Sequence, residues 1–143
     1  MDVFVEMRGR DFDVGEAKKC NPLGELMESW HKGESLGLKR KREFSDSGFS
    51  IYVGGEDDSE LAQESLDTVA FLRENAGEIR QLRALPGIDS AYIRFGTVWP
   101  SDSLMRVSSF PSDLLLACGE LGLGIDLCWY LGEPEFETDD ETI

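Results

Sequence analysis

Glycines lie between two cysteines in the stretch LLLACGELGLGIDLCWY, where Gly119, Gly122 and Gly124 separate Cys118 from Cys128. Such glycines can form a phosphate-binding loop, and paired cysteines can form a redox or metal site. A phosphate loop follows a strand and opens a helix, because amides at the helix N-terminus bind the anion. In this sequence the apolar run that precedes the glycines is typical of a helix, and a strand pattern follows them. We therefore expect Gly119 or Gly122 to end a helix in the left-handed conformation.

The three cysteines indicate reduced thiols rather than a disulfide framework. Their number is odd, no C-x-x-C pair occurs, and the single histidine, His31, is not at ligand spacing from any cysteine. Reactive thiols need a nearby positive group, and no lysine or arginine follows Arg106. We predict that Cys118 and Cys128 are inert thiols, either packed or partly exposed, and we predict no metal and no cofactor.

His31 and the basic run Lys39 to Arg42 are the other residues whose types suggest chemistry. Histidine is the commonest general base near neutral pH, and Glu28 and Glu34 are placed to orient this one. If LKRKREF is a strand, its four consecutive basic residues place positive charge on both faces, which is typical of an edge strand protected from aggregation. The alternative is that these basic residues bind an anionic ligand. A small-molecule-binding or enzymatic domain that uses His31 and the basic run is therefore our alternative to a non-enzymatic domain.

Charge is the strongest signal in the composition. The 143 residues include 29 acidic and 14 basic side chains, which gives a net charge of −15. This field repels nucleic acid and attracts basic partners, although solubility alone also explains it. No apolar run is long enough to span a membrane, and the N-terminus MDVFVEMRGRDF does not resemble a signal peptide. We expect a cytoplasmic protein with no nucleic-acid or membrane partner.

Alternating apolar residues predict three strands. The strands cover residues 2–8, 88–99 and 124–131, and their buried faces would carry Val3, Val5 and Met7, then Ala91, Ile93 and Phe95, then Ile125, Leu127 and Trp129. A hairpin is predicted around SDSG, between LKRKREF and a strand that contains Phe49, Ile51 and Val53. Residues 101–109 are either a further strand or a loop.

Helical spacing predicts three helical regions. Asp13 would cap a short helix that ends near Cys20 or resumes over PLGELMESW. A long helix over residues 60–85 has an apolar stripe formed by Leu66, Val69, Leu72, Ala76, Ile79 and Leu82. Asn75 and Gly77 predict a kink, or two consecutive helices. A short helix follows Pro111, capped by Ser112 or Asp113.

The order of these elements predicts one α+β domain over residues 1–132, followed by an acidic, flexible tail over residues 133–143. We expect a mostly antiparallel or mixed sheet with helices packed on one face. A ferredoxin-like duplicated layout is one arrangement of this kind, although the sequence contains no convincing repeat.

Several motifs together resemble the bacterial DUF4279 family, from about residue 3 to residue 131. They are VEMRGRDFDVGEA, WHKGE, SLDTVAFLRENAGEIRQLRALPGID and FPSDLLLACGELGLGIDLCWY. The family has no established catalytic residues, so the resemblance implies none here. Its relatives are similar to immunity proteins of polymorphic toxin systems, which implies a protein that occludes a toxin.

We therefore expect a non-enzymatic protein-binding domain whose target is a basic protein. The most specific form of this expectation is an immunity-type role, in which the domain occludes a toxin. The expected binding residues are aromatic anchors and acids at the head of the long helix: Trp30, Trp99 and Tyr130, with Asp57, Asp58 and Glu60. A homodimer that pairs an exposed strand is a further alternative.

Overall fold

A computed structural model describes residues 1–20, 23, 27–35, 43–55, 60–99 and 104–130. The strands are β1 (Asp2–Gly9), β2 (Met27–Trp30), β3 (Ser47–Gly54), β4 (Ser90–Val98) and β5 (Gly124–Tyr130). The helices are α1 (Val14–Lys19), α2 (Leu61–Glu74), α3 (Ala76–Arg83) and α4 (Ser112–Glu120). All five strands form one sheet in the order β2-β3-β1-β4-β5. The α+β class is confirmed.

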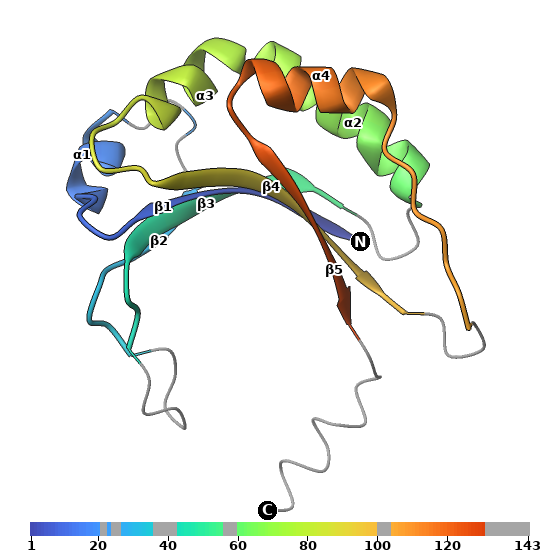
Figure 1. Cartoon of the computed structure of the whole chain (residues 1–143). Coiled ribbons are helices and arrows are strands. Elements are labelled where there is room, and N and C mark those ends of the chain that lie inside the picture. Colours follow the sequence, from blue (N-terminus) through green and yellow to red (C-terminus); the bar gives the residue numbers. More distant parts are fainter. Residues whose placement is uncertain (21–22, 24–26, 36–42, 56–59, 100–103, 131–143) are drawn as a thin grey trace, which may run out of the picture.

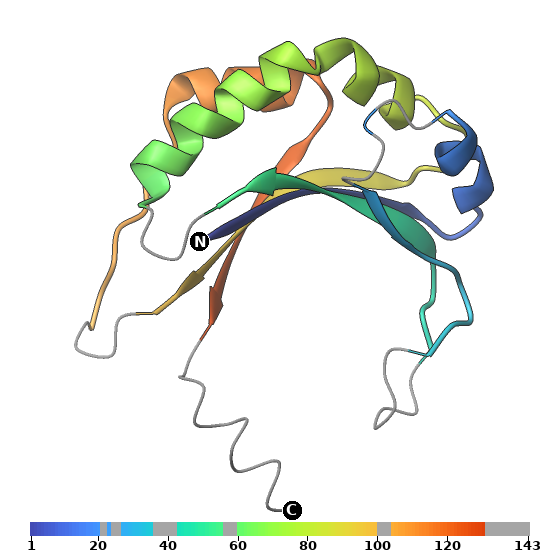
Figure 2. The ribbon, with the colours of Figure 1, turned by 180° about the vertical axis from the view of Figure 1, so that it is seen from behind.

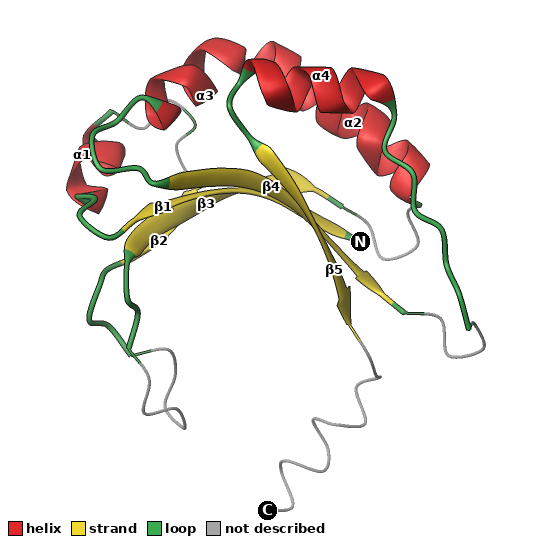
Figure 3. Cartoon of the chain, in the orientation of Figure 1, coloured by secondary structure: helices red, strands yellow, loops and turns green. Residues whose placement is uncertain are grey.

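The sheet is arched, and α2, α3 and α4 lie over its convex side (Figure 1). Viewed from behind, α2 lies in front of α4, so that α2 covers the β3 side and α4 the β5 side (Figure 2). Figure 3 shows that the described part of the chain places no helix on the concave side. One face of the sheet is therefore packed, and the other is open.

Strand pairing is antiparallel except between β4 and β5, which run parallel. The single described parallel unit is β4-α4-β5, whereas β1 is antiparallel to both of its neighbours. The first four strands, with α1 between β1 and β2 and with α2 and α3 between β3 and β4, lie in the order β2-β3-β1-β4 with all neighbours antiparallel, which is the ferredoxin-like strand order. The α4 helix and β5 extend this layout by one parallel strand, which makes the sheet mixed and mostly antiparallel.

Alternation along the strands builds the core as the sequence predicts. The fully buried strand residues are Val3, Val5, Met7, Phe49, Ile51, Ile93 and Phe95. They pack against helical residues that include Leu72, Ile79, Leu82 and Leu114. Because side chains alternate across a strand, the residues between them face the concave side.

The helix boundaries follow their sequence signals in most places. Asp13 caps α1, because its carboxylate accepts a hydrogen bond from the Gly15 amide at 2.8 Å. The long helical region is interrupted at Asn75, which confirms two consecutive helices. Pro111 is the N-cap residue of α4, which has no side-chain cap, so the predicted capping by Ser112 or Asp113 is wrong.

The apolar stripe of α2 differs from the predicted one. Leu66 is 62% exposed, whereas Ser65 and Thr68 are fully buried beside Leu72. The helix is therefore rotated relative to its strongest apolar pattern. The α2 helix packs against α4 and β3, and this packing turns the small residues Ser65 and Thr68 toward the core in place of Leu66.

The region before the basic run is a strand, not a helix. Met27–Trp30 forms β2 and pairs with β3, with Glu28 opposite Ser50 and Trp30 opposite Gly48. The helical spacing of apolar residues in PLGELMESW is thus misleading, because so short a segment takes its structure from its neighbours. Of the predicted hairpin around SDSG, the residues Lys39 to Arg42 lie outside the described residues. The hairpin itself is wrong, because Ser47 and Gly48 already belong to β3, and the two edges of β3 pair with β1 and β2.

Gly122 ends the helix–strand connection in the left-handed conformation, with φ of 72°. The Leu123 amide bonds the Cys118 carbonyl at 2.8 Å, and the Gly122 amide bonds the Gly119 carbonyl at 3.2 Å. Gly119 itself lies inside α4. The prediction of a glycine cap is confirmed at Gly122.

Candidate functional site

The open, concave face of the sheet carries the densest group of polar and aromatic side chains, and we call it the helix-free face. Its charged residues are mostly acidic: Asp2, Glu6, Glu28, Asp46 and Asp126 against Arg8 and Arg94. Its rings belong to Phe4, Trp30, Tyr52, Tyr92 and Tyr130. An exposed sheet face with both features is suited to binding.

Glu6 lies at the centre of this face, and its side chain is 14% exposed. Its carboxylate accepts hydrogen bonds from the Tyr92 hydroxyl and from Arg8, the latter at 3.0 Å. Arg94 approaches the same oxygen at 3.9 Å and also pairs with Asp126 at 3.5 Å. One carboxylate thus connects β1 with β4 and holds two guanidinium groups in place.

The two arginines also lie over aromatic rings. Arg8 is 4.9 Å from the Trp30 ring centre, and Arg94 is 5.1 Å from that of Tyr92. Within the described residues, the Nε atoms of both arginines are buried without a hydrogen-bond partner. Cation–π contact compensates part of that loss. The arginines are therefore part of a rigid floor rather than free surface cations.

A hollow of about 210 Å³ lies beside this floor, and we call it the acidic hollow. Its lining is Asp2, Phe4, Glu6, Glu28, Ser50, Arg94, Gly96 and Tyr130. Among the residues that the structure describes, Asp2 and Glu28 have no ion-pair partner. Three carboxylates against one arginine make the hollow electronegative, so that it favours a cationic group.

Tyr130 forms one wall of the acidic hollow, and its side chain is 56% exposed. Its ring lies against Gly96 of β4, where an added Cβ would be 3.0 Å from the ring carbon Cε2. Glycine at this position therefore lets the ring lie flat against the sheet. The flat ring offers an apolar surface beside the carboxylates.

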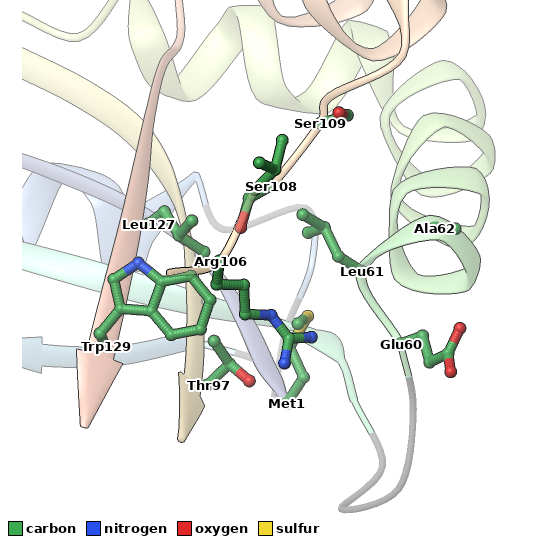
Figure 4. Close-up of a pocket in the computed structure, with 11 residues that line it drawn as sticks. Met1, Glu60, Leu61, Ala62, Thr97, Arg106, Ser108, Ser109, Leu127 and Trp129 are labelled. Atoms are coloured by element: carbon green, nitrogen blue, oxygen red, sulfur yellow. The ribbon is translucent and has the colours of Figure 1, made fainter. Parts of the chain in front are cut away.

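A second pocket opens on the other side of the sheet, where β4 and β5 end near the start of α2 (Figure 4). Its volume is about 310 Å³. Arg106 lies 5.5 Å from the ring centre of Trp129, and Ser108, Glu60 and Thr97 contribute polar groups. This pocket combines an aromatic wall with one exposed cation.

The predicted binding residues fall at different places. Trp30 and Tyr130 both lie on the helix-free face, on its two outer strands. Trp99 packs edge-on against Trp129 with ring centres 5.1 Å apart, and Glu60 lines the pocket of Figure 4. Asp57 and Asp58 lie outside the described residues. The structure thus brings two of the predicted anchors to one face and leaves Trp99 and Glu60 elsewhere.

His31 and the cysteines occupy unexceptional positions. His31 is exposed, and its main-chain amide, not its ring, bonds the Glu34 carboxylate at 2.7 Å. Burial raises the pKa of the Cys118 thiol to about 11, which keeps it protonated and unreactive. In the part of the chain that the structure describes, no group of His, Cys, Asp and Glu residues is arranged to hold a metal ion.

Sequence reasoning missed the residues that build the acidic hollow, namely Phe4, Glu6, Glu28 and Arg94. A signal for three of them was present, because Phe4 and Glu6 alternate with buried residues in β1, as Arg94 does in β4. Their common face became evident only when β1 was paired with β4, with Phe4 opposite Arg94.

Comparisons of the chain with protein-family models, with curated proteins and with solved structures found no match. The resemblance to DUF4279 therefore stays a prediction. No helix among the described residues is long and apolar enough to cross a membrane. The geometry of the helix-free face is consequently the main basis for an argument about function.

Proposed function

We propose that this protein is a non-enzymatic binding domain whose helix-free face captures a basic protein. The observation that carries this proposal is the acidic hollow, where Asp2 and Glu28 lack cationic partners among the described residues beside an exposed Tyr130. The net charge of −15 adds long-range attraction for a cationic surface.

The binding mechanism combines steering with a local anchor. The overall negative field accelerates encounter with a basic partner, and the concave face then receives one of its lysine or arginine side chains. The aliphatic part of that side chain lies along Phe4 and Tyr130, while its charged end meets Asp2 and Glu28. The Glu6–arginine floor stays fixed, so little ordering accompanies binding.

An immunity-type role belongs to this proposal. A protein that neutralises a toxin by occlusion needs a rigid complementary surface and no catalytic group. The resemblance of the sequence to DUF4279 supports this version, and the acidic, concave face is the surface that would cover a basic toxin.

The test is a calorimetric titration with a short arginine-rich peptide as a defined probe, and with any basic protein encoded beside the gene. We expect binding that weakens as salt concentration rises, because screening reduces the attraction between the charges. Replacing Asp2→Asn together with Glu28→Gln should weaken binding by at least about tenfold, which corresponds to about 1.4 kcal/mol.

The matched control changes the same number of charges on the helical side, with Glu74→Gln and Glu120→Gln, both exposed. This control should retain almost all of the affinity. Equal losses in the two double variants would show that only net charge matters, and would contradict the assignment of the hollow. No salt-sensitive binding by the wild type would contradict the proposal itself.

A second candidate function is small-molecule binding in the pocket of Figure 4. Its volume of about 310 Å³ lies within the range of ligand pockets, and the Arg106–Trp129 pair suits a small aromatic carboxylate. A thermal-melting screen with benzoate and related acids tests this candidate. A shift in the wild type that Arg106→Ala removes would support it, and no shift with any acid would contradict it. His31 does not line this pocket.

A further inference from the structure

The outer edge of β5 is unpaired within the described part of the chain. The sheet ends at this seven-residue strand, whereas its opposite edge is formed by the four-residue β2. Natural proteins usually protect a long edge with lysine, proline, a bulge or a covering element. The strand GIDLCWY has no lysine or proline, its one charged residue, Asp126, pairs with Arg94 of β4, and its ladder with β4 runs without a register shift.

The backbone of β5 presents hydrogen-bonding groups at regular spacing along this edge. The Tyr130 carbonyl accepts a bond from the Trp99 amide at 2.8 Å, so the backbone groups of Tyr130 point toward β4. These directions alternate along a strand. Ile125, Leu127 and Trp129 therefore point their N–H and C=O groups away from the sheet.

The apolar side chains of β5 are also incompletely covered. Ile125, Leu127 and Trp129 are only partly buried, whereas Ile93 and Phe95 on the neighbouring strand are fully buried. Both strands face the same helices, so the difference arises at the free edge. A further strand at this edge would complete the burial.

The flank of α4 above this edge carries no charge. Ala117 and Glu120 line a hollow with α2 and α3, which fixes the side of α4 that faces those helices. Leu115 is two positions from Ala117, about 200° around the helix, and so lies on the opposite flank with Gly119. Leu115 is 52% exposed, and an added Cβ on Gly119 would meet open space. In a chain with 30% charged residues, this flank is notably neutral.

We propose that two copies of this chain pair antiparallel through β5, with the α4 flanks in contact above the joined strands. An axis at Leu127 uses the whole strand and places Ile125 opposite Trp129 of the second copy. The outward backbone groups then face each other as hydrogen-bonded pairs. With the twofold axis at Leu127, Asp126 lies opposite the second copy's Cys128. A twofold axis at Asp126 would instead place the two Asp126 carboxylates opposite each other, where they would repel.

This pairing responds to salt in the opposite way to the capture of a basic protein. Two chains of charge −15 repel each other at long range, so added salt strengthens their association. The failure of one proposal is therefore distinguishable from the failure of the other.

Sedimentation equilibrium tests the pairing. We expect a mass of twice 16.0 kDa for the wild type at micromolar concentration and moderate salt. Leu115→Glu should raise the dissociation constant of the dimer by at least about tenfold, because it opposes two carboxylates at the contact. Leu116→Glu is the matched control, because Leu116 is 55% exposed but points away from the sheet, opposite Leu114. A monomeric wild type, or equal effects of the two variants, would overturn the proposal.

The register has its own test. Asp126→Cys would place a thiol opposite the second copy's Cys128 in a non-hydrogen-bonded pair, where Cα atoms are about 4.5 Å apart and a disulfide can form. Mild oxidation should yield a covalent dimer with this variant and not with Asp126→Ser. A covalent dimer of Asp126→Ser to the same extent would overturn the axis at Leu127, since its disulfide would form without a thiol at position 126.

Discussion

At the scale of single residues, Glu6 organises the helix-free face. It is one partly buried carboxylate that binds the Tyr92 hydroxyl and the Arg94 guanidinium from β4, and the Arg8 guanidinium from its own strand. Removing its charge leaves Arg8 and Arg94 with less compensation, although each keeps one aspartate partner, Asp46 and Asp126 respectively. The rigidity of the floor therefore depends on this side chain.

Glu6→Gln should lower the free energy of unfolding by about 1.5–3 kcal/mol, the usual range for hydrogen bonds to a charged group. Urea denaturation measures the change. The control is Glu16→Gln, because Glu16 makes one exposed ion pair with Lys19 at 3.7 Å, and its loss should cost less than about 0.5 kcal/mol. If the two variants lost the same free energy of unfolding, the Glu6 network would contribute no more to stability than an exposed ion pair.

The Cys118 thiol gives a prediction about pH. Its pKa is about 11 in the folded protein and 9.0 for an exposed thiol, so the Cys118 thiol of the unfolded chain loses its proton first as pH rises. Stability from this group is complete below pH 9 and is lost progressively between pH 9 and pH 11. The loss is about 2–3 kcal/mol at most.

Urea denaturation of the wild type and of Cys118→Ala over this pH range measures the effect. The variant should lose less stability than the wild type between the two pH values, because it has no thiol at this position to titrate. Parallel pH profiles would show that other groups account for the alkaline loss.

At the scale of elements, the connection between α4 and β5 depends on one glycine conformation. Gly122 has φ of 72°, whereas Gly119 lies in the helix with open space around it. Gly122→Ala should destabilise the protein by about 1–2 kcal/mol, the cost of a left-handed residue with a Cβ. Gly119→Ala should stabilise it by up to about 1 kcal/mol through helix propensity. Thermal unfolding of the two variants measures both changes in stability. If both variants were stabilised or both were destabilised, the assignment of Gly122 to the left-handed position and of Gly119 to the helix would be contradicted.

The face that α2 turns to the core gives another prediction. The Thr68 hydroxyl is buried without a hydrogen-bond partner among the described residues. Thr68→Val keeps the shape and removes the unsatisfied group, so it should raise the free energy of unfolding by about 1 kcal/mol. Thr97→Val, at the half-buried lining of the Figure 4 pocket, should change it by less than about 0.5 kcal/mol. Urea denaturation compares them, and a destabilised Thr68→Val would indicate a hydrogen bond made by this hydroxyl.

The sequence predicts the elements with a strong local pattern and misses those that depend on their neighbours. The alternation in β1 and β4 correctly assigns strands and buried faces, whereas in β5 it correctly assigns the strand but Ile125, Leu127 and Trp129 are only partly buried. Asn75 correctly marks the break between α2 and α3. The sequence pattern fails at β2, whose four residues become a strand only by pairing with β3. It also fails at Leu66, because the side of α2 that faces the core is chosen by packing against α4 and the sheet.

In the candidate site, too, some residues can be predicted from the sequence and others only from the pairing of the strands. Trp30 and Tyr130 are predicted from the sequence as aromatic anchors, and both lie on the helix-free face. The acids of the hollow come from different strands, Asp2 from β1 and Glu28 from β2. Only the strand order brings them to one place, and strand order cannot be derived from local periodicity.

At the scale of the whole molecule, the two faces of the sheet differ in what covers them. The convex face carries the helices and the core, and the described residues place no helix on the concave face, to which we assign the proposed partner (Figures 1 and 3). An acidic chain with an aromatic, electronegative hollow on its open face matches a basic protein better than it matches nucleic acid. The proposed pairing through β5 would join two such faces into one longer surface.

The most direct test of this account is an NMR titration of the ¹⁵N-labelled protein with the arginine-rich peptide, at low and at high salt. We predict that amide shifts gather at Phe4, Glu28 and Tyr130 and fade at high salt, while α2, α3 and α4 stay unchanged. Shifts confined to the helices, or spread evenly over the acidic surface, would contradict the claim that the helix-free face is the binding surface.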